Sequence, residues 1–134
     1  MKAGETEPTW VPIIVGLASQ FEQLKEHGGL HGLRDRNVLE SALDRPRNRY
    51  AYDSTADLAD LAAAYAFAIA TSHPFNDGYN RAAFTTAAIF LDLNGCDLAY
   101  AEPEVVRVVV ALAANEIDEP QLAEWIRAGL QPLG

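Results

Sequence analysis

Hydrophobic residues recur every three or four positions along most of this sequence, and that spacing is typical of amphipathic helices. The pattern is clearest over residues 57–70, an alanine-rich stretch with one continuous apolar stripe. The same spacing predicts a helix that begins at Trp10, capped by Thr9, and a shorter helix that begins after Asp35. Pro46 is expected to end the shorter helix, because the residue before a proline avoids the α region.

Three further helices are expected in the second half of the chain. Helical spacing resumes around Phe84 and ends just before Gly95. Residues 105–110 are rich in valine, whose β propensity alone allows a strand, but the residues before and after that run favour a buried helix. A last helix is predicted over residues 119–128, with a proline in its first turn.

One short segment departs from the helical pattern. In residues 47–54, Tyr50 and Tyr52 alternate with other residues, and this alternation favours an extended stretch or a small hairpin. No repeat, linker or low-complexity tract divides the sequence. We therefore expect a single all-α domain over residues 1–134. It should contain about six helices and a short β-like segment, with a core of about residues 10–128.

The composition narrows the functional classes. With 134 residues the chain is long enough to build one hydrophobic core, and its 49% hydrophobic and 22% charged residues are ordinary for a folded domain. Lys and Arg number 10 and Asp and Glu number 19, which gives a net charge of -9. An acidic domain is repelled by phosphate backbones, so nucleic acid is not expected as a partner.

The sequence also indicates the cellular compartment in which the protein is expected. The single cysteine, Cys96, can form neither an internal disulfide nor a cysteine-based zinc site. The first residues are polar and lack the pattern of a signal peptide. No apolar run approaches the roughly 20 residues that span a bilayer. We expect a cytoplasmic protein with no membrane partner.

The residues with the clearest chemistry lie in positions 73–81, His-Pro-Phe-Asn-Asp-Gly-Tyr-Asn-Arg, between two strong helical patterns. A loop that enters a helix presents unpaired backbone N–H groups and the positive end of the helix dipole, and both favour an anion. Asp77 is an oxygen ligand suited to Mg²⁺, Gly78 lets the backbone approach a ligand, and Arg81 can bind phosphate oxygens. His73 titrates near neutrality and can act as a general base. Together they form the parts of a phosphoryl- or nucleotidyl-transfer site.

A purely structural interpretation of the same residues is also open. The imidazole of His73 could cap the end of the preceding helix, and Asp77 could be an ordinary N-cap. Arg81 could then be a solvated surface residue. Spacing alone does not decide between the two interpretations.

The segment resembles the motif of the Fic/Doc (Fido) family, H-x-F-x-[DE]-[GA]-N-[KG]-R, and it matches that motif at His73, Phe75, Asp77, Gly78 and Arg81. Residues 26–46, 61–67 and 90–95 are also similar to the death-on-curing (Doc) toxins of this family. The resemblance covers about residues 10–128 and implies the all-helical Fic fold.

The resemblance implies a role for each matched residue. His73 would be the general base that takes the proton from a protein hydroxyl, and Phe75 would anchor the loop in the core. Asp77 would hold Mg²⁺ on the phosphates of ATP, the donor substrate. Gly78 and the backbone behind it would form an anion nest, and Arg81 would bind phosphate.

The family also implies partners. Doc members transfer the terminal phosphate of ATP to elongation factor Tu and stop translation, whereas most Fic members transfer AMP. A flap that pairs with the target peptide like a strand would correspond to residues 49–53, with Arg49, Tyr50 and Tyr52 as its candidate residues. Tyr50 and Tyr52 could equally be core residues. A Phd-type antitoxin with a disordered tail usually accompanies Doc.

Two positions of the nucleotide-binding stretch depart from the family. The family's Asn is Tyr79 here, and the Lys or Gly that follows it is Asn80. Phe84 lies where AMP-transferring members have a second arginine. Arg81 is the only Lys or Arg in residues 71–93. One arginine and one Mg²⁺ neutralise the negative charge of a triphosphate poorly.

Another part of the chain could supply the missing charge. Five of the ten basic residues are arginines at positions 34–49. They could reach the phosphates, or they could form a solvated face paired with Asp35, Glu40 and Asp44.

Three functional hypotheses follow. The first is an active Doc-like phosphotransferase toxin. The second is an active Fido enzyme with another donor or transfer mode, because Tyr79 and Asn80 differ from the family. The third is a catalytically degenerate member that acts as a binding module, and the intact His73, Asp77 and Arg81 count against it.

Overall fold

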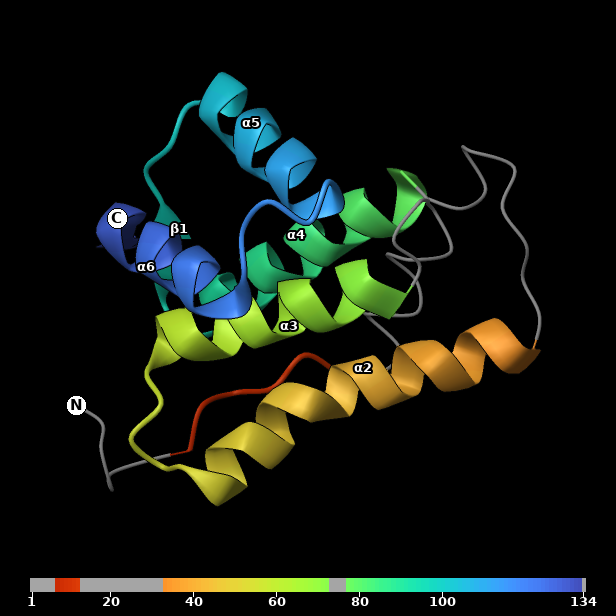
Figure 1. Ribbon diagram of the computed structural model, residues 1–134. Coiled ribbons are helices and arrows are strands. Elements are labelled where there is room, and N and C mark those ends of the chain that lie inside the picture. The colour runs from red at the N-terminus through yellow and green to blue at the C-terminus, as the bar shows by residue number, and fades with distance from the viewer. Residues whose placement is uncertain (1–6, 13–32, 73–76, 134) are drawn as a thin grey trace.

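A computed structural model describes residues 7–12, 33–72 and 77–133 of the chain. Within these ranges the chain is mostly helical (Figure 1), which confirms the all-α prediction. The elements in chain order are α2 (Leu33–Tyr52), α3 (Leu58–Ser72), α4 (Asp77–Leu93), β1 (Cys96–Leu98), α5 (Glu102–Ala113), α6 (Glu119–Gly129) and β2 (Leu130–Pro132).

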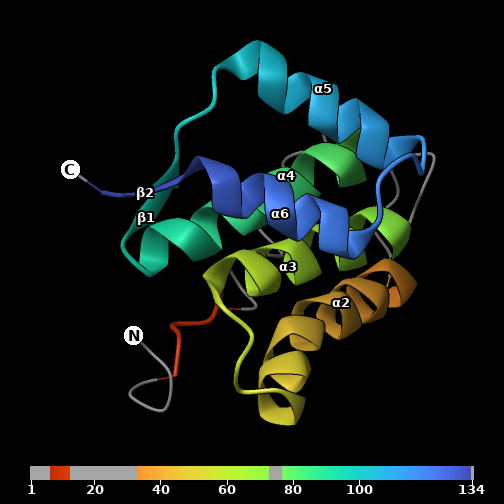
Figure 2. The same cartoon turned by 60° about the vertical axis from the view of Figure 1, so that its left-hand side comes forward.

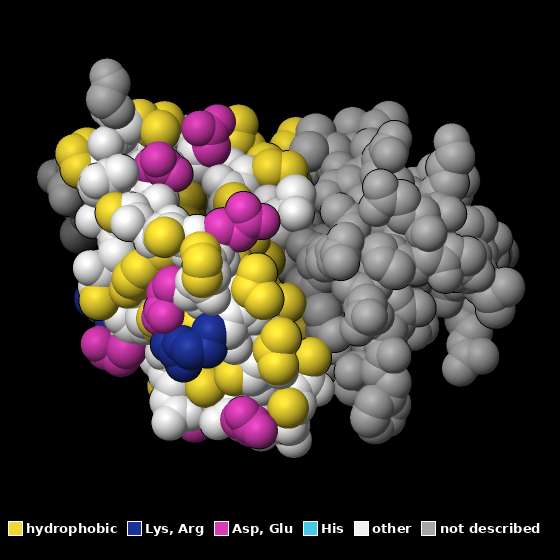
Figure 3. Space-filling view, turned by 90° about the horizontal axis from the view of Figure 1, so that it is seen from above, with side chains coloured by type: hydrophobic (Ala, Val, Ile, Leu, Met, Phe, Trp, Pro, Cys, Tyr) yellow, Lys and Arg dark blue, Asp and Glu magenta, His cyan; other side chains and the backbone are white. Residues whose placement is uncertain are grey.

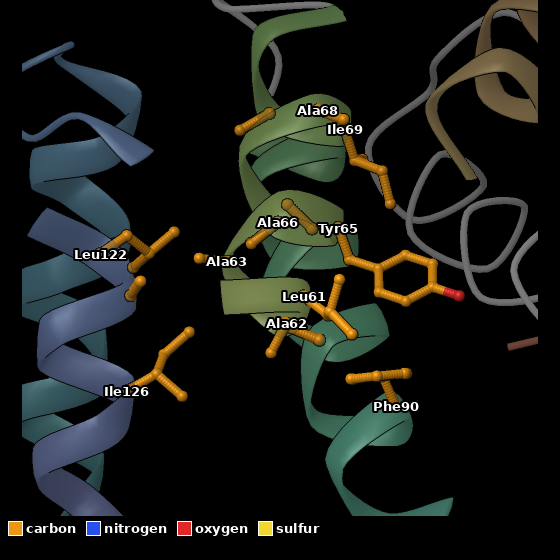
Figure 4. Packing of buried hydrophobic residues seen from close by; sticks show 14 of the residues in the cluster. Leu61, Ala62, Ala63, Tyr65, Ala66, Ala68, Ile69, Phe90, Leu122 and Ile126 are labelled. Carbon is orange, nitrogen blue, oxygen red and sulfur yellow. The ribbon is translucent and has the colours of Figure 1, made fainter. Parts of the chain in front are cut away.

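Helix α3 is the centre of the molecule. It packs against α2, α4 and α6, and its residues from Leu61 to Ala66 are all buried. Small alanine side chains let neighbouring helices approach closely. Leu122 and Ile126 of α6 point toward α3 in Figure 4, whereas Phe90 of α4 lies near the ring of Tyr65 on another side. Helix α3, which has the clearest helical pattern in the sequence, is thus the helix that the others surround (Figure 2).

The segment of residues 7–12 is not helical, so the predicted helix start at Trp10 is wrong. Its backbone is bound to other elements instead. The N–H of Val11 donates to the hydroxyl of Tyr65 (3.0 Å), and the side-chain amide of Asn94 bonds both the N–H (2.8 Å) and the carbonyl (2.9 Å) of Thr9. Trp10 stacks on Phe90 with ring centroids 5.8 Å apart. These long-range contacts replace the local hydrogen bonds of a helix. The rest of that predicted helix, residues 13–32, lies outside the described residues.

Helix α2 continues through Pro46 to Tyr52, so both the predicted helix end and the predicted extended segment after it are wrong. Proline removes one backbone hydrogen bond from a helix interior. Here Pro46 is fully buried, and the arginines on either side of it, Arg45 and Arg49, both bond Glu119 of α6. Burial and ion pairs therefore hold a helix that local sequence preference would end.

The valine-rich run forms helix α5, as the flanking residues predicted. Val108 and Leu112 are buried against the bundle. Among the helices that the structure describes, none is both long and apolar enough to cross a membrane. Helix α6 also has the predicted position and begins with a capping box, in which Asp118 and Gln121 each bond the other's backbone N–H.

The two short strands were not predicted. They pair antiparallel, with Leu98 opposite Leu130. Three-residue strands are too short to show alternation, and these form because the α4–α5 connection lies beside the chain segment after α6. A glycine is required there: a Cβ on Gly129 would come within 2.3 Å of the ring of Tyr100. That ring is held by stacking on Trp125 and by its hydroxyl, which donates to the Trp125 carbonyl (2.8 Å).

Candidate functional site

The motif lies where α3 ends and α4 begins. Helix α3 ends at Ser72 and α4 begins at Asp77, and the two helices lie side by side (Figures 1 and 2). Residues 73–76 lie outside the described residues, so the structure gives no position for His73 or Phe75. The predicted helix start within the motif is confirmed at Asp77.

The first turn of α4 consists of residues 77–80. The first four N–H groups of a helix have no partner within it, and the helix dipole is positive at this end. The backbone at Asp77 and Gly78 therefore has the property that an anion site needs. The side chains of Asp77, Tyr79, Asn80 and Arg81 are outside the described part of the structure, and their roles stay predictions.

The helices on both sides of the motif are firmly anchored. In α3, the hydroxyl of Thr71 donates to the carbonyl of Phe67 (2.7 Å), one turn earlier in the same helix, and Ile69 and Ala70 are buried. In α4, Ala83, Ala87 and Phe90 are buried in the core. A site built at this junction would rest on rigid elements, which is what precise positioning of reacting groups requires.

Phe84 has a structural role in this chain. Its ring centroid lies 6.5 Å from that of Trp125 in α6, in a tilted arrangement typical of aromatic pairs. Trp125 is itself fixed, because its indole N–H donates to Glu104 (2.9 Å). The position where some relatives have a second arginine is thus used for packing between α4 and α6.

The three residues predicted to form a target flap lie in the last turn of α2. Arg49 bonds Glu119 (3.1 Å), Tyr50 packs edge-on against Trp10, and Tyr52 is 95% exposed. This end of α2 is next to the beginning of α3, whereas the motif follows the end of α3 (Figures 1 and 2). Since α3 has 15 residues, the two places are about 22 Å apart along its axis. The described residues thus place Arg49, Tyr50 and Tyr52 near the start of α3 and away from its end at Ser72, and their target-binding role stays a prediction.

The described arginines near Pro46 bond or pack against residues outside the motif. Arg45 and Arg49 are paired with Glu119, and the guanidinium of Arg47 lies over the ring of Trp10 at 5.8 Å from its centroid. The structural interpretation of this cluster is confirmed for these three residues. For Arg45 and Arg49 the predicted partners are wrong, because the carboxylates that pair with them are Glu119 of α6 and Asp60 of α3. Sequence proximity could not reveal a pairing between helices.

The described side chains include no group of three or more His, Cys, Asp or Glu that could hold a metal ion. A Mg²⁺ role for Asp77 therefore rests on its chemistry and on its position at the start of α4. A carboxylate at that position is an oxygen donor next to unpaired N–H groups, which suits a metal bound to phosphate.

The similarity of the chain to known proteins decides its family. A model of the Fic/DOC family matches residues 17–91, more than half of the chain and all nine motif positions. The chain belongs to the Fic/DOC family.

Two relatives carry the Doc name. The chain is 34% identical over 111 residues to "Protein kinase doc" of Escherichia phage P1, which covers 83% of this chain and 87% of that protein. It is 38% identical over 73 residues to "Toxin Doc" of Mycolicibacterium smegmatis, which covers 54% of this chain and 56% of that protein. The resemblance inferred from the motif is thereby confirmed.

Proposed function

We propose that this chain is a Doc-type toxin that transfers the terminal phosphate of ATP to a hydroxyl group on a protein, with elongation factor Tu as the expected target. The observation that supports this most is the similarity to a protein named as a kinase over most of both chains. Two relatives named Doc, one of them named as a toxin, also support a toxin of a toxin–antitoxin system. A Phd-like antitoxin is the partner that we expect on these grounds.

His73 is the proposed general base. It takes the proton from the target hydroxyl as that oxygen forms a bond to the terminal phosphorus of ATP. The bond between this phosphorus and the bridging oxygen breaks, and ADP leaves with that oxygen. This step needs a neutral imidazole, and a large fraction of histidine side chains is neutral near pH 7.

The other motif residues bind the phosphates. The N–H groups of the first turn of α4 would donate to phosphate oxygens, and Arg81 would add a forked, charged donor. Asp77 would hold Mg²⁺, which neutralises charge on the phosphates when it is bound. Each role follows from residue type and from the start of α4 at Asp77.

A second function within the family is favoured by one specific observation. Tyr79 and Asn80 replace the family's amide and its Lys or Gly, and the described arginines of α2 near Pro46 are paired elsewhere. With Arg81 as the one Lys or Arg in residues 71–93, the motif would suit another donor or transfer mode better than ATP. The third possibility is a catalytically degenerate binding module, which would show no transfer in an activity test.

The test is mass spectrometry of purified elongation factor Tu after incubation with the protein, ATP and Mg²⁺. We expect a single added phosphate, and a rate about 10²–10⁴-fold lower for His73→Ala, because a general base typically contributes that much. Circular dichroism of the variant controls for its fold. Transfer of AMP would favour the second function, and equal activity of the variant would contradict the catalytic role of His73.

A further inference from the structure

The face of α4 that carries the motif continues into the next turns of the helix. Positions 77, 80, 81 and 84 recur at helical spacing, so Asp77, Asn80, Arg81 and Phe84 belong to one face of α4. We call this the motif face. Side chains of a helix lean toward its N-terminus, so the ring of Phe84 lies over the turn that contains positions 80 and 81. A residue that holds Phe84 in place therefore also supports that turn.

The side chain that contacts Phe84 is Trp125 of α6. The two ring centroids are 6.5 Å apart and the rings are tilted by 58°. Trp125 has three contacts of its own. Its ring stacks on Tyr100 at 4.3 Å, its carbonyl accepts a hydrogen bond from the Tyr100 hydroxyl (2.8 Å), and its indole N–H donates to Glu104 (2.9 Å). These contacts hold the ring of Trp125 in one orientation against Phe84.

Glu104 is itself a fixed hydrogen-bond acceptor. Arg107, one turn later in α5, bonds both of its carboxylate oxygens (3.0 and 2.6 Å). Hydrogen bonds from Arg107 and from Trp125 lower the pKa of Glu104 to about 2, so the carboxylate is ionised near neutral pH. In Figure 3, which views the molecule from the side of α5, basic and acidic side chains lie next to each other on this face. The support of Trp125 therefore persists under ordinary assay conditions.

The buried residues of α4 give less support near the motif. Ala83 is buried and next to Phe84, but its side chain is a single methyl group. Phe90 is large and buried, but it lies near the other end of α4. Among the described side chains of α4, Phe84 is thus the bulky one nearest to Arg81. Its contact with Trp125 is the one best placed to fix the rotation of the motif face.

We propose that Trp125 is a positioning residue for Arg81 and acts through Phe84. The contact between the two rings fixes the direction in which the motif face presents Arg81 to a phosphate. Direction matters for arginine, because its forked donors must align with two phosphate oxygens at once. The inference rests on the phosphate-binding role proposed for Arg81. It adds residues of α5 and α6, which lie outside the residues 17–91 that match the family model.

The test is titration calorimetry of the whole protein with ATP and Mg²⁺. Trp125→Leu removes the ring from Phe84, and we expect about tenfold weaker binding of ATP, because a misaligned charged donor loses much of its hydrogen bonding. Phe84→Leu weakens the same contact from the α4 side, should have the same effect, and replaces Trp125→Leu if that variant does not fold.

The matched control is Trp10→Leu, which removes another contact between a tryptophan and a phenylalanine of α4. The ring of Trp10 lies 5.8 Å from that of Phe90, near the end of α4 away from the motif. This variant should bind ATP within about twofold of the parent, because distant sites act independently. An equal loss in Trp10→Leu and Trp125→Leu would overturn the inference, and so would unchanged binding by Trp125→Leu.

Arg81→Lys separates positioning from a general effect on the fold, because it keeps the charge and removes the forked donors. If Trp125 acts through Arg81, Trp125→Leu should change ATP affinity by less than about twofold in the Arg81→Lys protein. An equal loss in both backgrounds would overturn the inference. ATP binding that depends on Trp125 without phosphate transfer would contradict the proposed function alone. Transfer that Trp125→Leu leaves unchanged would contradict the inference alone, and a parent protein that binds no ATP would contradict both.

Discussion

At the scale of single residues, Tyr79 and Asn80 are where the motif departs from its family. Both belong to the first turns of α4, at the end of the helix that favours an anion. If they weaken an otherwise standard site, Tyr79→Asn with Asn80→Lys should tighten ATP binding. A charged hydrogen bond contributes about 1.5–3 kcal/mol, so we expect affinity to rise by about tenfold or more. Titration calorimetry with ATP and Mg²⁺ measures it.

The opposite result has an equally clear meaning. If Tyr79 and Asn80 are adapted to another donor, the double variant should lose native activity while its affinity for ATP changes little. No ATP binding by either protein would favour the degenerate binding module.

At the scale of elements, the segment of residues 7–12 is held to the bundle by hydrogen bonds and ring contacts with α2, α3 and α4. One of them is the buried hydrogen bond from the N–H of Val11 to the hydroxyl of Tyr65. Tyr65→Phe removes the acceptor and leaves that N–H without a partner. We expect a loss of about 1–3 kcal/mol in the free energy of unfolding, measured by urea denaturation.

Tyr52→Phe is the matched control, because the ring of Tyr52 is 95% exposed and the same hydroxyl is removed. It should change stability by less than about 0.5 kcal/mol. An equal effect of the two substitutions would show that the bond to Val11 does not stabilise the fold.

The elements differ in how far the sequence could predict them. Helices α3, α4, α5 and α6 follow their apolar spacing, because each buries one stripe against its neighbours. The end of α2 could not be predicted, since Glu119, from a distant part of the chain, bonds arginines on both sides of Pro46. The predicted helix start at Trp10 is wrong for a similar reason. Asn94 and Tyr65, which are distant in the sequence, accept hydrogen bonds from the backbone N–H groups of Thr9 and Val11.

The candidate site also has one part that the sequence could predict and one that it could not. The motif predicted a helix start within residues 73–81, and α4 begins at Asp77, because the residues of a loop and a helix N-terminus are local in sequence. The proposed flap depended instead on which segment lies beside the motif, which local pattern does not reveal. In the structure, the end of α2 with Tyr50 and Tyr52 lies at the other end of α3.

At the scale of the whole molecule, arginines and carboxylates connect three helices. Arg127 of α6 bonds both carboxylate oxygens of Asp57 (2.9 and 3.0 Å) and one oxygen of Asp60 (2.9 Å) near the start of α3. Arg49 of α2 lies 4.0 Å from the same oxygen of Asp60 and also pairs with Glu119. This junction fixes α2, α3 and α6 relative to one another at the end of the bundle opposite the motif.

The junction makes stability depend on pH in a predictable direction. Burial raises the pKa of Asp57, but hydrogen bonds from Arg127 and from the backbone N–H of Asp60 outweigh it and lower the pKa to about 2. The ordinary value of 3.8 applies to the unfolded chain. Above that value the carboxylate is ionised in both states, and its contribution to stability is fully present. As the pH falls toward 2, the unfolded chain binds a proton that the folded chain does not, and the contribution is lost.

Asp57→Asn should therefore destabilise the protein at pH 7 and have less effect in acid. The side chain of Asp57 is half exposed and screened by water, so we expect a loss of about 1 kcal/mol at pH 7. The difference from the parent should shrink between about pH 4 and pH 2.

Urea denaturation between about pH 7 and pH 2 measures this difference in the free energy of unfolding, with Glu124→Gln as the control. Glu124 bonds Arg127 from a largely exposed position, and its removal should cost less than about 0.5 kcal/mol. A difference for Asp57→Asn that stays constant with pH would show that its stabilisation comes from packing or capping and not from the charge of the carboxylate.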